Sequence, residues 1–144
     1  MTNGDTNLSH DLKRDKRLAR RELAASLMSN TKWRVLFKTL QAPELAIRQI
    51  KVKFTDGPEV KCMELPWLSA PYAFVDSMSF GPFPLVSLEW IEVPAEAVFP
   101  VGDGATAKRH VQNLFAVRAA LEATGKRFVF GEAPDGLRIV GHAP

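Results

Sequence analysis

The last third of the chain constrains the fold more than any other segment. An amphipathic pattern over residues 106–124 predicts a helix, and Gly125 stands where a helix C-cap with positive φ is expected. The chain then has the pattern of two short strands, 126–131 and 137–141, joined by a turn at 133–136. A helix that runs directly into a β-hairpin is typical of an α+β domain.

Hydrophobic periodicity predicts another helix and three strands earlier in the chain. Ser29 and the two polar residues after it offer capping side chains for the helix, and Pro43 ends it. Apolar and polar residues then alternate with the period of a strand at 47–54. A return strand at 60–65 and a third strand at 85–93 follow, and a proline-rich, aromatic loop separates them.

The first 28 residues differ in character from the rest. Leucine and alanine residues recur on one helical stripe at 9–28, and residues 1–30 hold six basic and four acidic side chains, which is two of the three net positive charges. We therefore expect a basic amphipathic N-terminal arm at 1–28 and a single α+β domain at 29–144. The expected order is ααβββαββ, with a mainly antiparallel sheet covered by helices on one face.

Composition narrows the class of protein. A chain of 144 residues with 46% hydrophobic positions can bury one core without disulfides or a structural metal. Its apolar runs are far shorter than the ~20 residues of a membrane helix, and the N-terminus lacks the apolar segment of a secretory signal. The single cysteine, Cys62, cannot form an internal disulfide. These features favour a soluble, cytoplasmic protein that does not associate with membranes.

Three short motifs, taken in order, resemble a small bacterial domain family of unknown function. They are Asn-Thr-Lys-Trp at 30–33, Leu-Glu-Trp-Ile-Glu at 88–92 and Gly-Leu-Arg-Ile-Val-Gly at 136–141. The resemblance covers roughly residues 29–142. It implies the α+β fold and the domain limits, and it carries over no catalytic residue.

A cluster of basic residues is the most unusual local feature. Lys108, Arg109 and His110 would fall in the first turns of the predicted helix, where the partial positive charge of the helix end disfavours cations. Compensation by Asp103 and by solvent is one explanation, and an anion-binding site for phosphate is the functional one. The spacing of the glycines and the lysine does not match a phosphate-binding loop.

Aromatic and arginine residues indicate a surface for a partner. Trp67 lies at the start of the proline-rich loop that also holds Tyr72, and exposure of these rings would favour protein recognition over core packing. Arg14, Arg17 and Arg21 lie on the polar side of the expected arm, where they would either be solvated on a docked helix or meet an acidic protein or a nucleic acid.

Catalytic and metal sites find little support in the sequence. The three histidines and the single cysteine are scattered, so they lack the spacing of zinc ligands. Glu89 and Glu92 should lie on opposite faces of a strand as solvated carboxylates, unless a bulge intervenes. We therefore expect no metal and no cofactor. The leading hypothesis is a non-enzymatic bacterial accessory or protein-interaction domain. The alternatives are a module that binds nucleic acid or a phosphorylated ligand, and an uncharacterised enzyme.

Overall fold

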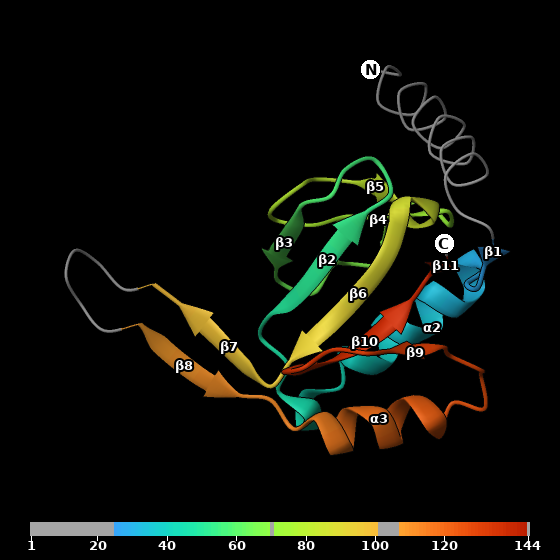
Figure 1. The fold of residues 1–144 in the computed structure, drawn as a ribbon. Helices are drawn as coiled ribbons and strands as arrows, with labels where there is room; N and C mark the ends of the chain where they lie inside the picture. The colour runs from blue at the N-terminus through green and yellow to red at the C-terminus, as the bar shows by residue number, and fades with distance from the viewer. Residues whose placement is uncertain (1–24, 70, 101–106, 144) are drawn as a thin grey trace.

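A five-stranded antiparallel sheet organises the molecule (Figure 1). The structure is a computed structural model that describes residues 25–69, 71–100 and 107–143. The strand order is β3-β2-β6-β10-β9. The bounds are β2 Ile50–Phe54, β3 Val60–Met63, β6 Leu88–Pro94, β9 Phe130–Gly131 and β10 Gly136–Val140. Together with two helices this sheet confirms a small α+β fold with mainly antiparallel strands.

Helix α2, Asn30–Leu40, begins where the capping signal predicts it. The hydroxyl oxygen of Ser29 accepts a hydrogen bond from the backbone N–H of Lys32 at 3.1 Å, which satisfies one of the free donors at the helix start. One stripe of the helix is buried in the core, namely Trp33, Leu36, Phe37 and Leu40. Packing of this stripe, rather than helix propensity, supplies most of the stability of so short a helix.

Helix α3, Leu114–Glu122, is shorter than the sequence pattern indicates. Its N-cap is Asn113, whose side-chain oxygen accepts from the backbone N–H of Ala116 at 3.1 Å. Beyond its end Gly125 has φ of +76°, so the positive φ predicted at this position is confirmed. None of the described helices is long and apolar enough to cross a membrane.

The core lies against one face of the sheet. The register pairs Val52 with Ile91 and Ile91 with Ile139, so side chains of the same parity on three strands form one apolar layer. This layer belongs to the same buried cluster as the apolar residues of α2 and α3. The sheet contributes Ile50, Val52, Met63, Leu88, Ile91, Val93, Leu137 and Ile139 to this cluster.

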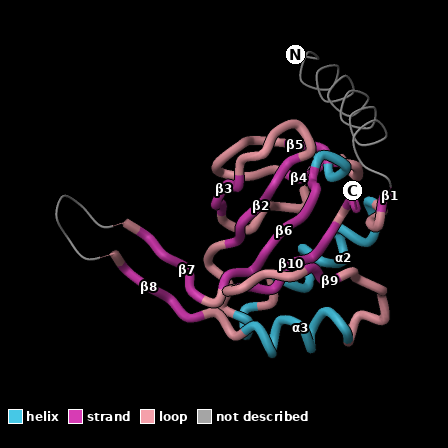
Figure 2. The backbone as a smooth tube through the Cα atoms, in the orientation of Figure 1, coloured by secondary structure: helices cyan, strands magenta, loops and turns pink. Residues whose placement is uncertain are grey.

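Three smaller antiparallel pairs surround the central sheet. They are β1 Ala25–Ser26 with β11 His142–Ala143, β4 Phe74–Val75 with β5 Phe83–Pro84, and β7 Glu96–Phe99 with β8 Lys108–Val111. Two single 3-10 turns, η1 Pro43–Leu45 and η2 Leu85–Ser87, complete the described elements. The β7–β8 hairpin projects away from the rest of the fold (Figure 2).

The structure corrects the sequence prediction at residues 107–113. The expected helix is wrong in this part, because Lys108–Val111 pairs with Glu96–Phe99 as a strand and the helix begins only at Leu114. The pairing joins residues that are distant in sequence, so a helical stripe that includes His110 is overridden by a tertiary contact.

The N-terminal arm falls mostly outside the described residues, so its limits and the full element order stay predictions. The expected helix is wrong at its last residues, because Ala25–Ser26 pairs with His142–Ala143 as strand β1. These residues contact the body. The backbone N–H of Leu27 donates to the carbonyl of Gly141 at 2.8 Å, and Met28 is buried in the core.

Candidate recognition surface

The proline-rich segment between β3 and β6 is tied to α2 by one arginine. Arg34 Nη1 donates to the carbonyl oxygens of Tyr72 at 3.1 Å and Phe74 at 3.2 Å, and Nη2 donates to that of Leu68 at 2.6 Å. The guanidinium also lies 5.0 Å from the centroid of the Tyr72 ring. A planar cation with several fixed donors can hold three backbone positions at once, which an ammonium cannot do.

Further contacts hold the same segment. Gln41 Nε2 donates to the carbonyl oxygen of Pro66 at 2.6 Å, and Thr31 Oγ1 is hydrogen-bonded to the hydroxyl of Tyr72. Trp67 and Asp76 exchange two backbone hydrogen bonds at 2.8 and 3.1 Å. The segment therefore has an ordered backbone although it contains little regular secondary structure.

Two aromatic side chains on this ordered backbone face solvent. Trp67 is 46% exposed and Tyr72 is 57% exposed, whereas Trp33 and Trp90 are buried. Met78 and Phe80 of the same segment are exposed as well. We call residues 66–69 and 71–83 the aromatic segment. Large rings held in place at the surface lose little conformational entropy on binding, which favours recognition of a partner.

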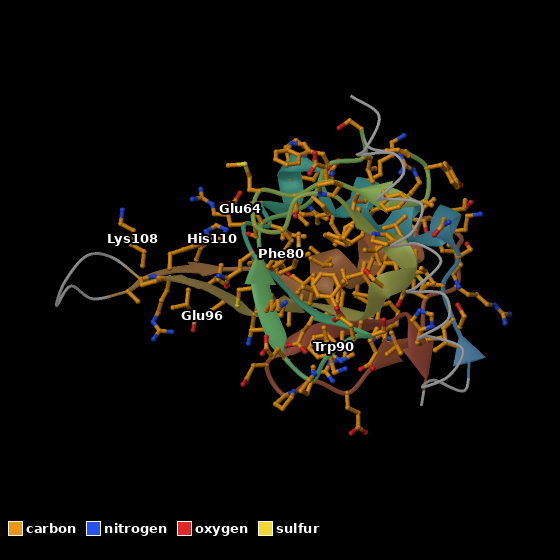
Figure 3. The ribbon with its side chains drawn as sticks, turned by 90° about the horizontal axis from the view of Figure 1, so that it is seen from above. Glu64, Phe80, Trp90, Glu96, Lys108 and His110 are labelled. Carbon is orange, nitrogen blue, oxygen red and sulfur yellow. The ribbon has the colours of Figure 1, made fainter. Side chains whose placement is uncertain are left out.

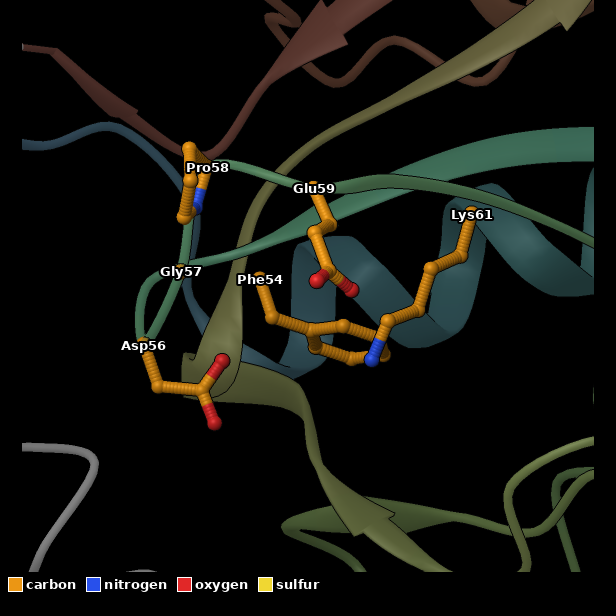
Figure 4. A pocket seen from close by; sticks show the side chains of 6 residues that line it. All are labelled: Phe54, Asp56, Gly57, Pro58, Glu59 and Lys61. Carbon is orange, nitrogen blue, oxygen red and sulfur yellow. The ribbon is translucent and has the colours of Figure 1, made fainter.

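An open pocket of about 310 Å³ adjoins the aromatic segment at the turn between β2 and β3 (Figure 4). The rings of Phe54 and Phe80 meet edge to face with centroids 5.8 Å apart. The ammonium of Lys61 lies 5.5 Å from both centroids, so a cation of the protein itself already occupies this aromatic corner. The remaining lining residues are Asp56, Gly57, Pro58 and Glu59.

The basic residues singled out in the sequence lie on the projecting hairpin (Figure 3). Lys108 and Arg109 are exposed, and His110 Nε2 donates to the carbonyl oxygen of Ala46 at 2.8 Å. Strand alternation directs Lys108 and His110 to one face and Arg109 to the other. The structure therefore does not bring these three side chains together at a helix end, and the helix-dipole argument for an anion site no longer applies.

Arg109 has an acidic neighbour on the same hairpin. Its Nη1 lies 3.4 Å from Glu96 Oε1, and both side chains are about half exposed, so this pair contributes little to stability. Asp103, which was expected to compensate the basic residues, lies outside the described residues. The arm residues Arg14, Arg17 and Arg21 lie outside them too.

The candidate carboxylates of β6 are both engaged by cations. Glu92 Oε1 accepts from Arg138 Nε at 3.1 Å and Nη2 at 2.9 Å, and the guanidinium lies 3.8 Å from the Trp90 ring centroid. Glu89 pairs with Lys53 at 3.0 Å. The expectation of two solvated carboxylates is wrong for Glu92, which is buried beneath this pairing.

The strand register explains the position of Glu89. It shifts between Lys53 and Phe54, so the bulge considered in the sequence analysis is present and brings Glu89 to the side of Lys53. Cys62 is exposed on β3. Within residues 25–69, 71–100 and 107–143, no group of three His, Cys, Asp or Glu side chains is arranged to hold a metal ion.

Sequence reasoning missed the residues that shape this surface. Arg34 lies on the polar side of a helix, where an arginine is ordinarily solvated, and no local signal distinguishes it. The exposure of Trp67 and Tyr72 was one of two alternatives in the sequence, and the structure shows that both rings are exposed. No family model, curated protein or solved structure matches this chain. The resemblance to a small bacterial family stays a prediction from its three motifs.

Proposed function

We propose that this chain is a non-enzymatic accessory or protein-interaction domain of the bacterial cytoplasm. In this proposal helices cover one face of the sheet, and the aromatic segment binds a protein partner. One observation carries the proposal: Trp67 and Tyr72 are exposed on a backbone that Arg34 fixes from α2.

The physical case rests on preorganisation. Tryptophan and tyrosine are enriched among the residues that dominate binding energy at protein interfaces. A loop that is ordered before it meets its partner avoids the entropy cost of ordering on binding. The exposed rings of Trp67 and Tyr72 meet both conditions, and their removal should affect binding more than folding.

The basic arm has a separate role in this proposal. Arg14, Arg17 and Arg21 would attract an acidic partner and raise the association rate, with a dependence on salt that the aromatic contacts do not share. Binding of nucleic acid or of a phosphorylated ligand is the second candidate. The exposure of Lys108 and Arg109 on a projecting hairpin favours it, because a β-ribbon of this kind can reach phosphates or enter a major groove.

The test is affinity capture of tagged, full-length protein from cross-linked host cells. Wild type is compared with Trp67→Ala and with Phe115→Ala, the latter being an exposed aromatic residue on α3 that serves as the matched control. We expect a protein that is captured by wild type and by Phe115→Ala at low and raised salt, and that is lost with Trp67→Ala.

A further variant separates the two candidates. Changing Arg14, Arg17 and Arg21 together to Ala should weaken capture only at low salt. The proposal would be contradicted if the captured material were nucleic acid, if its amount decreased steeply with salt, and if Trp67→Ala did not change it. That result would favour the second candidate.

A further inference from the structure

The β7–β8 hairpin is a short two-stranded sheet without a third strand among the described residues. Each of its strands has four residues, and of these eight only Ala97 is buried. A two-stranded ribbon is only marginally stable in water, and a third strand or a packed face is needed for more. The ribbon projects from the body (Figure 1).

The register shows which backbone groups of the hairpin point outward. The N–H of Gln112 donates to the carbonyl of Ala95 at 2.8 Å, so Ala95 and Gln112 form a hydrogen-bonded pair. From there, pairs without and with hydrogen bonds alternate along the ladder, in which Glu96 lies opposite Val111, Ala97 opposite His110 and Val98 opposite Arg109. Only every second pair of an antiparallel ladder exchanges hydrogen bonds. The N–H and C=O groups of Val98 and Glu96 therefore point away from β8, and those of Arg109 and Val111 point away from β7.

The two outer edges of the hairpin differ. At β7 the side-chain amide of Gln49 takes the place of a strand: its Nε2 donates to the carbonyl of Val98 at 3.1 Å, and its Oε1 accepts from the N–H of Val98 at 3.2 Å. At β8 no strand of the described chain pairs with Arg109 and Val111. The edge of β8 is therefore the open one, and open edges are where an extended peptide can add as a strand.

The side chains along the open edge indicate which residues a pairing strand should carry. Lys108 and Arg109 are basic and exposed, and Val111 is 74% exposed. A second copy of β8 would place basic residues near their own copies, which disfavours self-pairing. A segment with acidic residues opposite Lys108 and Arg109 and an apolar residue opposite Val111 would complement the edge.

We propose that the edge of β8 binds an extended acidic segment of a partner protein as a third, antiparallel strand. The backbone groups of Arg109 and Val111 make the ladder, and Lys108 and Arg109 form ion pairs with the acidic residues. This site is separate from the aromatic segment and goes beyond the proposed function.

The experiment uses the full-length protein and two synthetic peptides. The first is acetyl-Thr-Val-Thr-Glu-Asp-Thr-amide, which places valine opposite Val111 and its acids opposite Arg109 and Lys108. In the second, lysines replace both acids. Binding is measured by NMR titration together with amide hydrogen exchange. The amides of Arg109 and Val111 should exchange rapidly in the free protein and be protected by the acidic peptide. The lysine peptide should bind about fivefold or more weakly, because two opposite-charge cross-strand pairs are lost.

Two variants sharpen the result. Lys108→Glu combined with Arg109→Glu should reverse the preference between the peptides. Val111→Pro should abolish the protection, since it removes a donor that faces the open edge and not the ladder to β7. Slow exchange of Arg109 and Val111 in the free protein, or equal binding of both peptides, would overturn the proposal. Loss of peptide binding in Trp67→Ala would also overturn it, because the site would then lie on the aromatic segment.

Discussion

The aromatic segment and the β7–β8 hairpin are both peripheral, yet the fold uses them in opposite ways. The segment between β3 and β6 has little regular secondary structure, but it contributes Phe74, Val75 and Phe83 to the buried interior. The hairpin is regular, but it buries only Ala97. Regular hydrogen bonding thus does not identify the structural part of this molecule, and the irregular segment is the more deeply integrated of the two.

In each region one polar side chain makes several hydrogen bonds to the backbone. Arg34 holds the aromatic segment, and Gln112, which is 2% exposed, holds the base of the hairpin. Gln112 Oε1 accepts from the N–H groups of Arg48 at 2.8 Å and Gln49 at 3.1 Å, and its Nε2 donates to the carbonyls of Gln49 at 3.0 Å and Pro94 at 2.9 Å. The base of the hairpin is therefore structural, while its outer part stands free.

The largest expected effect follows from removing a buried ring of the aromatic segment. Phe83→Ala should lower the free energy of unfolding by about 3–5 kcal/mol, because it removes a core side chain that packs edge to face on Phe54 with centroids 5.1 Å apart. Phe115→Ala, which truncates a ring that is 86% exposed, should change it by less than about 0.5 kcal/mol. Urea denaturation of both variants measures the free energy of unfolding. A small loss of stability for Phe83→Ala would show that this segment is not part of the core.

Removing the anchor of the hairpin should come next. Gln112→Leu should destabilise the protein by about 3 kcal/mol, since the N–H groups of Arg48 and Gln49 and two carbonyls lose their buried partner. Gln49→Ala removes only the contacts to Val98 at the surface and should cost less than about 1 kcal/mol. If Gln112→Leu and Gln49→Ala had the same melting temperature, the base of the hairpin would not be more important for stability than its outer part.

Removing the anchor of the aromatic segment should have an intermediate effect. Arg34→Met should cost about 2 kcal/mol, because three carbonyls lose a charged donor but are partly open to water. Arg34→Lys should restore little, as one ammonium cannot reach all three carbonyls. Amide exchange at Trp67 and Asp76 should accelerate in both variants, and unchanged exchange would show that the segment is ordered without Arg34.

A glycine outside both regions provides a backbone reference. Gly125→Ala should cost about 1 kcal/mol, because its φ of +76° penalises a side chain while the added Cβ would meet no atom within 4 Å. Thermal melting measures this purely conformational cost. A stability equal to that of wild type would mean that the left-handed turn after α3 relaxes without penalty.

Local signals in the sequence predicted the parts of the fold that depend on local physics. The start of α2 at Ser29, the strand β2 and the positive φ of Gly125 could all be predicted, because each depends on residues that are close together in the sequence. The hairpin could not, because β7 and β8 are stabilised by each other across a long connection. Asn113 was a local capping signal for the true start of α3 that the longer apolar stripe obscured.

The candidate surface divides in the same way. Proline and aromatic content identified the segment that holds Trp67 and Tyr72, but the choice between core and surface depends on packing that no local pattern contains. Arg34 contacts carbonyls more than 30 positions away in the chain. A contact of that range becomes visible only when the fold brings the helix and the loop together.

The smallest expected effect on stability belongs to Trp67, the residue on which the proposed function rests. The purified Trp67→Ala variant should unfold within about 0.5 kcal/mol of wild type, because the ring is about half exposed and lies outside the core cluster, while capture of the protein partner from cells should be lost. Stability is measured on the purified variant and capture on cells that express it, with Phe115→Ala alongside in both measurements. Retention of the partner by a stable Trp67→Ala variant would contradict the account, as would destabilisation by more than about 2 kcal/mol, which would make Trp67 a structural residue.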